Sequence, residues 1–499
     1  MREGPKSRLN PDSTALQKLR QILKESGYCA AGIAPTVGDV ALRLPNESVS
    51  ATPLNTLLRL FHLLEPVATQ NADAALQPLT ITELTDAGMI RIDGENVRAN
   101  VLIQPYQDLL FAIDQLTREN QPENALMQIS PSSLWVAHLM ARRPSRNSLD
   151  LGTGCGFLAA LVAQHSEHVC AVDLNPSAVE SADFNCRWNE LRNVTCLEGN
   201  LTAPVRDQRF DLIVSNPPFM ICPVPNAPAS RVRFKHSGQE GDDFCINLAR
   251  EAAQLLYESG YFHMAFEWLE HEGEDWTAKL AKSFSGTDCD IWGMRMYSLA
   301  PEDYVIDWLA GLQRGPEDDP EALYREGVQY FQQRKVKSIG SGLVTMRRCS
   351  TRPNLLWFDE APEDLSEPYG ESVSALFDVR IQCSNRSEGD LLEEKPMVSP
   401  DIGMIQKAQL EKGRWDVTAS ELLRQRGLKY CFSEVSPQLL RLVALMDGEC
   451  TLRQAFERLS REEHMALPEV IAKYLPEVRE LIWFGFLIPT GVARAPLSK

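Results

Sequence analysis

Because one hydrophobic core stops growing near ~250–300 residues, the 499 residues of this chain predict two or three domains. The composition, with 44% hydrophobic and 24% charged residues, excludes a mostly disordered or fibrous chain. The 50 Lys and Arg against 68 Asp and Glu give a formal net charge of −18, which argues against a surface coated in nucleic-acid-binding charge but not against a local basic site.

Cysteine usage and the absence of long apolar runs indicate the compartment. Twelve cysteines are scattered from Cys29 to Cys450 without a C-x-x-C pair or a Cys/His cluster at zinc-ligand spacing. Neither a metal site nor a disulfide scaffold is indicated, and reduced thiols are the simplest interpretation. The polar N-terminus lacks the apolar segment of a signal peptide, and no run of ~18 apolar residues occurs. We expect a cytoplasmic protein without a membrane span.

Residues 1–120 are predicted to form an N-terminal helical or winged-helix domain. Leucines recur at helical spacing over 56–65, a second helix is plausible over 79–87, and alternating apolar residues flank Asp93-Gly94, a two-residue hairpin signal. Such a domain could bind nucleic acid or a partner, or it could serve in dimerisation or as a lid. The second role is favoured, because the expected second helix has no Lys or Arg to meet phosphates.

Residues 121–349 alternate short apolar segments with helical segments. This pattern predicts parallel strands joined by crossover helices. Five such strands are expected between residues 148 and 266, and two more between residues 289 and 348. We therefore predict an α/β fold with a Rossmann-like core of seven strands.

A glycine turn follows the first of these strands. Gly152, Gly154 and Gly156 lie between Asp150 and a helix that begins near Phe157. Glycine is needed where a backbone turns tightly and approaches a ligand, and the spacing is shorter than that of a dinucleotide fingerprint. Asp150 would repel a phosphate but can accept hydrogen bonds from an amino group. The pattern therefore favours S-adenosylmethionine over NAD as the cofactor.

Asp173 closes the second strand, 23 residues after Asp150. This is close to the ~20-residue offset at which an acidic residue reaches ribose hydroxyls in nucleotide-binding α/β folds. A helix cap or turn is the alternative role, because Asn175-Pro176 follows directly. Its position relative to the glycine turn favours the ribose.

The fourth strand leads into Asn216-Pro217-Pro218-Phe219. Such dipeptides can simply mark a turn. They also suit a specific task, in which the prolines hold the backbone rigid, Asn216 and a nearby carbonyl accept hydrogen bonds from a planar amino group, and Phe219 stacks on that group. Held in line with a methyl donor, the nitrogen needs little help from a base, because positioning can lower a barrier by ~7–11 kcal/mol.

These motifs together resemble the class I S-adenosylmethionine-dependent methyltransferases of the NPP[FY] group. That group includes release-factor glutamine N5-methyltransferases and the enzymes that methylate amino groups of bases in RNA and DNA. The resemblance spans roughly Ser130 to Cys349 and implies direct N-methylation without a metal. It implies that the NPPF residues hold the target nitrogen, that Asp173 holds the ribose, and that the methionine end is held by Asp150, Gly152, Thr153, Gly154 and Gly156. Members often have an Asp beside the adenine, where this chain has Asn200.

The segment after NPPF is locally basic. It contains Arg231, Arg233, Lys235 and His236. These residues are candidates for binding phosphates or an acidic protein surface of the substrate. The alternative is a solvated loop whose cations pair with nearby acidic residues.

The last part of the chain changes character twice. Residues 350–400 hold four Lys and Arg against eleven Asp and Glu, a local charge of −7, and are predicted to be an acidic, irregular connector. Residues 401–499 are predicted to form a helical or winged-helix-like domain. It should have one helix stopped by Asp447-Gly448, one begun by a Thr cap at Thr451, and a longer one running into a strand at 486–488.

The predicted function is an N-methyltransferase that uses S-adenosylmethionine. Its substrate is predicted to be an amide or exocyclic amino nitrogen of a macromolecule, either a nucleobase in RNA or DNA or a protein glutamine. One alternative is a small-molecule or peptide N-methyltransferase whose N-terminal domain is a dimerisation lid. The other is a non-catalytic regulator that binds S-adenosylmethionine. The sequence does not decide the oligomeric state.

Overall fold

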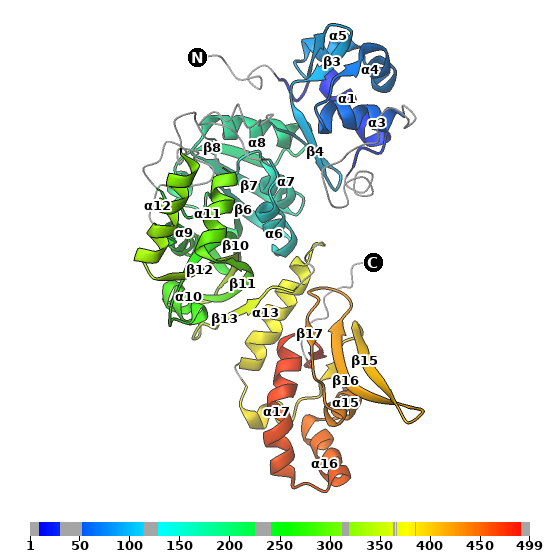
Figure 1. Cartoon of the computed structure of the whole chain (residues 1–499), viewed down its shortest axis with the longest axis vertical. Coiled ribbons are helices and arrows are strands. Elements are labelled where there is room, and N and C mark those ends of the chain that lie inside the picture. The colour runs from blue at the N-terminus through cyan, green and yellow to red at the C-terminus, as the bar shows by residue number, and fades with distance from the viewer. Residues whose placement is uncertain are drawn as a thin grey trace. The chain divides into compact units, whose positions relative to one another are not determined.

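The computed structural model describes residues 9–29, 52–113, 128–224, 241–311, 319–362, 365, 367–384 and 386–490. The chain divides into two compact units, whose elements are labelled in Figure 1. Unit 1 comprises Met1–Ala137 and Pro144–Asp359, and unit 2 comprises His138–Arg143 and Glu360–Lys499. Each unit has apolar core clusters of its own, as a chain of this length requires.

An eight-stranded sheet forms the centre of unit 1, and its strand order is β13-β11-β12-β10-β9-β6-β7-β8. The strands from β8 to β10 in this order are parallel, whereas β12 is antiparallel to both β10 and β11. The strands are β6 (Ser145–Leu151), β7 (Ser166–Asp173), β8 (Val194–Glu198), β9 (Phe210–Ser215), β10 (Leu256–His271), β11 (Cys289–Leu299), β12 (Val336–Arg348) and β13 (Leu356–Glu360).

The α/β class is confirmed, but the predicted count of seven strands is one too low. All seven predicted strands are present, and the eighth, β13, lies in the segment predicted to be an irregular connector. Trp357 of β13 is buried, and the Phe358 ring lies so close to β11 that a Cβ on Gly293 would stand 2.4 Å from it. This short apolar run was not recognised because most of the charged residues around it are acidic.

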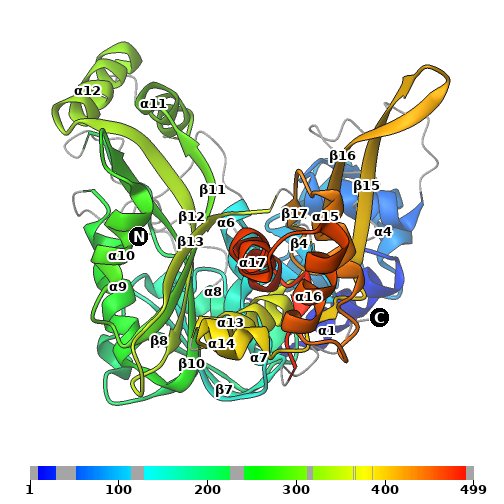
Figure 2. The same ribbon diagram turned by 90° about the horizontal axis from the view of Figure 1, so that it is seen from below.

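Helices join the strands and cover the sheet. Helices α9 and α10 pack on the sheet in one core cluster (Figure 2). Helix α7 is apolar throughout and all seven of its residues are buried. The helices are α6 (Pro131–Leu139), α7 (Phe157–Ala163), α8 (Pro176–Trp188), α9 (Asp243–Gln254), α10 (Trp276–Phe284), α11 (Pro301–Ala310) and α12 (Pro320–Gln333).

The N-terminal part of unit 1 combines helices with a small sheet of order β1-β3-β2. The predicted hairpin is confirmed, with Gly94 and Glu95 as its loop because Asp93 pairs with Asn96. The two predicted helices are also present, while the winged-helix assignment stays a prediction. The elements are α1 (Thr14–Glu25), α3 (Pro53–Leu57) with a π-helical continuation (Leu58–His62), β1 (Val67–Ala68), α4 (Thr69–Leu76), α5 (Ile81–Asp86), β2 (Ile90–Asp93) and β3 (Asn96–Ala99).

A second hairpin, β4 (Leu102–Tyr106) and β5 (Leu109–Ile113), lies against α8 through two asparagine side chains. The Asn189 amide accepts a hydrogen bond from Leu110 N at 3.0 Å and donates to Leu110 O at 2.7 Å. The Asn185 amide does the same with Ala112, at 2.9 and 3.2 Å, and also donates to Cys155 O at 2.9 Å. The buried edge of β5 is therefore satisfied by side chains instead of a third strand.

Residues 350–400 are not irregular, and that prediction is wrong. Besides β13 they contain α13 (Gly370–Ser384) and α14 (Glu388–Leu392). Val373 and Phe377 of α13 are fully buried, while Glu371 lies in its first turn. The net charge of the segment did not reveal that apolar and acidic positions occur within the same helix. The division between the units falls after Asp359, ten residues beyond the predicted boundary.

Unit 2 also contains the predicted C-terminal helices. Thr451 caps α16 and forms a capping box with Gln454, as the sequence indicated for its start. The long hairpin β15–β16 was not predicted. The elements after α14 are β14 (Met397–Val398), β15 (Ile402–Glu411), β16 (Arg414–Arg424), β17 (Cys431–Phe432), α15 (Pro437–Ala444), α16 (Leu452–Glu463), α17 (Leu467–Trp483) and β18 (Leu487–Ile488).

No helix among the described residues is long and apolar enough to cross a membrane.

The Asn185 side chain gives a first testable prediction. Replacing Asn185 with Ala leaves the backbone groups of Ala112 and the Cys155 carbonyl without their buried partner, at about 1–3 kcal/mol for each unsatisfied group. We expect the free energy of unfolding in urea to fall by about 3 kcal/mol in total. Asn71→Ala, at an exposed position of α4, is the matched control and should change stability little. Equal effects of the two substitutions would contradict this account of β5.

Candidate active site

The carboxyl ends of β6 and β9 meet at the point where the strand order reverses. From β6 the chain proceeds through β7 and β8 in one direction, and then returns to add β9 and β10 on the other side of β6. Ligands of open α/β sheets bind outside the carboxyl ends of the strands at such a switch point. The Ser215 hydroxyl donates to Leu151 O at 2.7 Å and ties these two strand ends together.

The glycine turn lies at this edge, directly after β6. Gly152, Gly154 and Gly156 have φ of +73°, +55° and +82°, which L side chains rarely adopt. A Cβ on Gly156 would stand 2.8 Å from Ala182 Cα of α8, and one on Gly152 would stand 3.9 Å from Pro217 Cα. A Cβ on Gly154 would meet nothing within 4 Å. Gly156 thus serves helix packing, while Gly154 borders open space.

Asp150 is buried and holds the turn in shape. Its Oδ2 accepts hydrogen bonds from Thr153 Oγ1 at 2.7 Å and from Ala159 N at 3.0 Å. Burial is the main reason that the pKa of Asp150 is raised to about 7, and the two hydrogen bonds act against this rise. Both of these hydrogen bonds go to the same carboxylate oxygen, Oδ2.

Asp173 joins the end of β7 to the same turn. Its Oδ2 accepts from Gly154 N and its Oδ1 from Asn175 N, both at 2.9 Å. The cap of α8 is Asn175, whose side chain accepts from Ser177 N, so Asp173 is not the helix cap. Gly199 N donates to Asp173 O at 2.9 Å, which brings the exposed Asn200 to the same edge.

The NPPF motif begins at the end of β9, and a neighbouring helix orients its first residue. Asn216 Nδ2 donates to Ser133 Oγ at 2.8 Å and to Ser130 Oγ at 3.3 Å. Its Oδ1 is buried and has no hydrogen-bond partner within the described residues. Phe219 is partly buried and packs against the sheet's core cluster. The amide therefore presents a free acceptor, as a target N–H requires.

Ser130 and Ser133 were not predicted as site residues. Ser130 caps α6, because its Oγ accepts from Ser133 N at 3.1 Å, and Pro131 occupies the first helical position. The Ser-Pro pair is a recognisable helix start. It could have located the helix, but not the asparagine that the helix contacts.

The predicted residues Arg231, Arg233, Lys235 and His236 lie outside the described residues. In the part of the chain that is described, no group of three or more His, Cys, Asp or Glu side chains could hold a metal ion.

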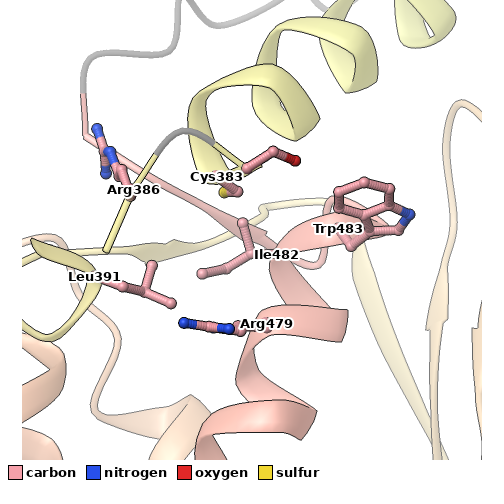
Figure 3. Close-up of a pocket in the computed structure, with 7 residues that line it drawn as sticks. Cys383, Arg386, Leu391, Arg479, Ile482 and Trp483 are labelled. Carbon is pink, nitrogen blue, oxygen red and sulfur yellow. The ribbon is translucent and has the colours of Figure 1, made fainter. Parts of the chain in front are cut away.

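A cavity of about 210 Å³ in unit 2 contains none of the predicted site residues. Arg386 and Arg479 line it, together with Cys383 and Trp483 (Figure 3). Arg386 is already paired with Glu394. The cavity is smaller than the ~300–1,000 Å³ typical of ligand pockets, so we place the candidate active site in unit 1.

Comparisons with known proteins agree with this site. Residues 129–224, which include the glycine turn and NPPF, match the family described as Methyltransferase small domain. The release factor glutamine methyltransferase of Salmonella typhimurium is 32% identical over 199 residues, which are 38% of this chain and 69% of that protein. The tRNA1(Val) (adenine(37)-N6)-methyltransferase of Enterobacter sp. is 30% identical over 198 residues, 37% of this chain and 79% of that protein. The chain belongs to the S-adenosylmethionine-dependent N-methyltransferases of the small-domain type.

Other comparisons concern the rest of the N-methyltransferase and its fold. Residues 26–100 match a family described as Domain of unknown function, DUF7059. Among solved structures, YcgJ from Bacillus subtilis has a TM-score of 0.29 at 14% identity and covers 44% of this chain and 97% of its own. Trm5b from Pyrococcus abyssi has a TM-score of 0.28 at 15% identity, covering 51% and 62%.

S-adenosylmethionine is the cofactor of this N-methyltransferase, and the residues at the switch point fit it. The space beside Gly154 leaves room for a ligand at the turn, and Asp173 stands at the distance along the chain expected for a ribose contact. Asn216, whose buried Oδ1 has no partner in the described structure, directly follows the adjoining strand β9.

The glycines give a second prediction, because Gly154 and Gly156 serve different purposes. Gly156→Ala places a methyl group against the α8 backbone at a positive φ, so we expect the free energy of unfolding to fall by about 3 kcal/mol. Gly154→Ala meets no protein atom and should cost only about 1–2 kcal/mol, but its methyl group would enter the open space in which we expect the cofactor. Calorimetric titration with S-adenosylmethionine should show at least about tenfold weaker binding. Unchanged binding by Gly154→Ala would place the cofactor elsewhere.

The buried carboxyl of Asp150 gives a third prediction. Its pKa is raised to about 7 in the folded chain from an ordinary 3.8. A raised carboxyl pKa means that ionisation opposes folding, so this residue's contribution to stability is lost as pH rises from about 4 through 7. Asp150→Asn removes that titration. In urea unfolding without ligand, the stability of the variant relative to the parent should rise between pH 5 and pH 8. A relative stability that is constant or falls would be inconsistent with the raised pKa.

Proposed function

We propose that this N-methyltransferase acts on an amide or exocyclic amino nitrogen of a macromolecule, namely a nucleobase in RNA or DNA or a glutamine in a protein. The observation that carries the proposal is the orientation of Asn216. Two serines bind its Nδ2, so its Oδ1 is left as a buried acceptor without a partner in the described structure. A planar NH₂ group supplies the donor that this oxygen lacks, and glutamine and adenine both carry one.

The mechanism follows from how the chain holds that nitrogen. Asn216 Oδ1 accepts one N–H of the target, the rigid prolines fix its direction, and Phe219 packs against the planar group. The nitrogen lone pair would take the methyl group that bound S-adenosylmethionine supplies on a positively charged sulfur. The S–C bond would break to leave a neutral thioether, and the nitrogen would then release one proton to water. The residues contribute mainly position, which can be worth ~7–11 kcal/mol of the barrier.

The roles predicted for the other residues belong to the same proposal. Asp173 contacts the ribose, Asn200 lies beside the adenine, and the methionine end is held by Asp150 and by the turn of Gly152, Thr153, Gly154 and Gly156. The basic loop with Arg231, Arg233, Lys235 and His236 contacts the substrate. We also propose a cytoplasmic location, because none of the twelve cysteines is part of a disulfide.

The names of the relatives support a macromolecular substrate. The Salmonella protein is named for a release factor glutamine and the Enterobacter protein for an adenine of tRNA. Both targets are NH₂ groups on planar, conjugated carbons. Incubation with tritiated S-adenosylmethionine and separate RNA, DNA, protein and small-molecule fractions tests the proposal. Label in the small-molecule fraction alone would overturn it, and no label in any fraction despite cofactor binding would favour a regulator.

Asn216 and Ser133 give a fourth prediction, measured on the fraction that accepts label. Asn216→Ala removes the acceptor and should lower kcat by about 100-fold. Ser133→Ala loosens the Asn216 amide by one hydrogen bond and should lower kcat by about tenfold. Cofactor affinity should be unchanged in both variants, because neither side chain belongs to the glycine turn.

Ser132→Ala is the matched control for Ser133→Ala. Ser132 lies one residue away on the same helix, and its hydroxyl contacts Ser130 Oγ at 2.8 Å instead of Asn216. Its kcat should stay within about twofold of the parent, because the direct bond to Asn216 is retained. Methyl transfer that persists at the parental rate in Asn216→Ala would sink the proposed role of the asparagine.

A further inference from the structure

A polar row crosses one face of the sheet next to the active site. Glu267 of β10 pairs directly with Ser341 of β12, and Ser341 pairs directly with Tyr297 of β11. Directly paired residues of antiparallel strands lie on the same face. Ser341 Oγ donates to Glu267 Oε1 at 3.3 Å. The row therefore ends at Glu267, on the strand that neighbours β9 and its NPPF motif.

Glu267 and Tyr304 both bind the backbone just after that motif. Glu267 Oε2 accepts hydrogen bonds from Ile221 N at 3.2 Å and from the Tyr304 hydroxyl at 2.6 Å. The same hydroxyl accepts from Ile221 N at 2.9 Å and lies 3.0 Å from Ile221 O. Ile221 follows Phe219 by two residues. Its peptide groups are thus held from two sides, by β10 and by α11.

Apolar contacts support the same attachment. Ile221 and Val224 are buried in a cluster with Tyr304 and Trp308 of α11 and Phe331 of α12. The Tyr304 ring packs edge-on against Phe331, with 5.6 Å between the ring centroids. Helices α11 and α12 lie between β11 and β12 in the chain and pack on each other (Figure 2). This pair of helices is where the segment after NPPF is seated.

Burying a carboxyl group to hold one peptide carries a large desolvation cost. Glu267 is 4% exposed, and burial raises its pKa to about 7 against the effect of its three hydrogen-bond donors. Within the described structure no Lys or Arg forms an ion pair with it, although Glu270 on the same strand pairs with Arg295. An apolar residue would suit a purely structural position better. A carboxyl retained at the edge of an active site points to a functional reason.

We propose that Glu267 and Tyr304 are positioning residues for methyl transfer, which hold the backbone at Ile221 and thereby fix Phe219 against the target group. The inference rests on the role proposed above for the NPPF residues. The hydrogen bonds of Glu267 and Tyr304 reach Ile221, so both residues act on the NPPF segment through the backbone that follows it. Their loss should affect turnover and leave the affinity for S-adenosylmethionine unchanged.

Three variants test this fifth prediction. Tyr304→Phe removes the hydroxyl and keeps the ring packing, Glu267→Ala removes the acceptor, and Glu267→Gln keeps the size and can still accept from Ile221 N–H. Amide hydrogen exchange of peptides covering residues 219–224 should become at least about tenfold faster in Tyr304→Phe and Glu267→Ala. On the substrate fraction found by labelling, kcat should fall about tenfold in Tyr304→Phe and Glu267→Ala. Glu267→Gln should change both the exchange rate and kcat less than Glu267→Ala does.

Glu270→Gln is the matched control, three residues further along β10. It removes the charge that pairs with Arg295 and one of the two oxygens that accept from Arg295 and Ser338, and it should leave exchange at 219–224 and kcat near the parental values. Unchanged exchange in Tyr304→Phe and Glu267→Ala would overturn the anchoring, whatever the substrate proves to be. Faster exchange with unchanged kcat would overturn the positioning role. Full activity of Asn216→Ala would instead count against the proposed function, while the exchange measurement would still decide whether the anchor exists.

Discussion

The backbone path at the end of β6 determines where every other part of the active site lies. Three glycines with positive φ turn the chain within five positions. The last of them, Gly156, lies so close to α8 that a Cβ would clash with Ala182. Because β6 is also the strand at which the order of the sheet reverses, the ends of β7 and β9 are brought to either side of this turn. Asp173 and Asn216 therefore lie at the same edge of the sheet, on either side of the glycine turn.

The substrate side of the site depends on contacts from distant parts of the chain. Helix α6 orients the Asn216 amide, whereas side chains of β10 and α11 bind the backbone of Ile221, two residues after Phe219. The NPPF segment is thus held at its first residue and again two residues beyond its last. A short motif rich in proline is stiff by itself, but its direction is set by these two attachments. Two separate attachments suit the function proposed for this site, which is to place one nitrogen.

Short-range patterns in the sequence predicted the parts of this protein that local physics dictates. The glycine turn, Asp173 and NPPF were recognisable because each lies within a few residues of a strand end. Ser133 and Glu267 were missed, since they meet Asn216 and Ile221 only after folding, from 83 and 46 residues away along the chain. Strand β13 was hidden by the acidic residues around it. The β15–β16 hairpin was missed because most of its residues are exposed on both faces, so no alternation marks it.

The two asparagines of α8 also protect this protein from aggregation through β5. Four residues of an α-helix rise about 6 Å, and two residues of a strand advance about 6.6–6.8 Å. The spacing of Asn185 and Asn189 therefore matches that of Ala112 and Leu110. Their side chains bind alternate residues of β5, much as a neighbouring strand would. An unpaired edge on a strand of five buried residues is a template for aggregation. A helix that matches its period removes that hazard without adding another strand.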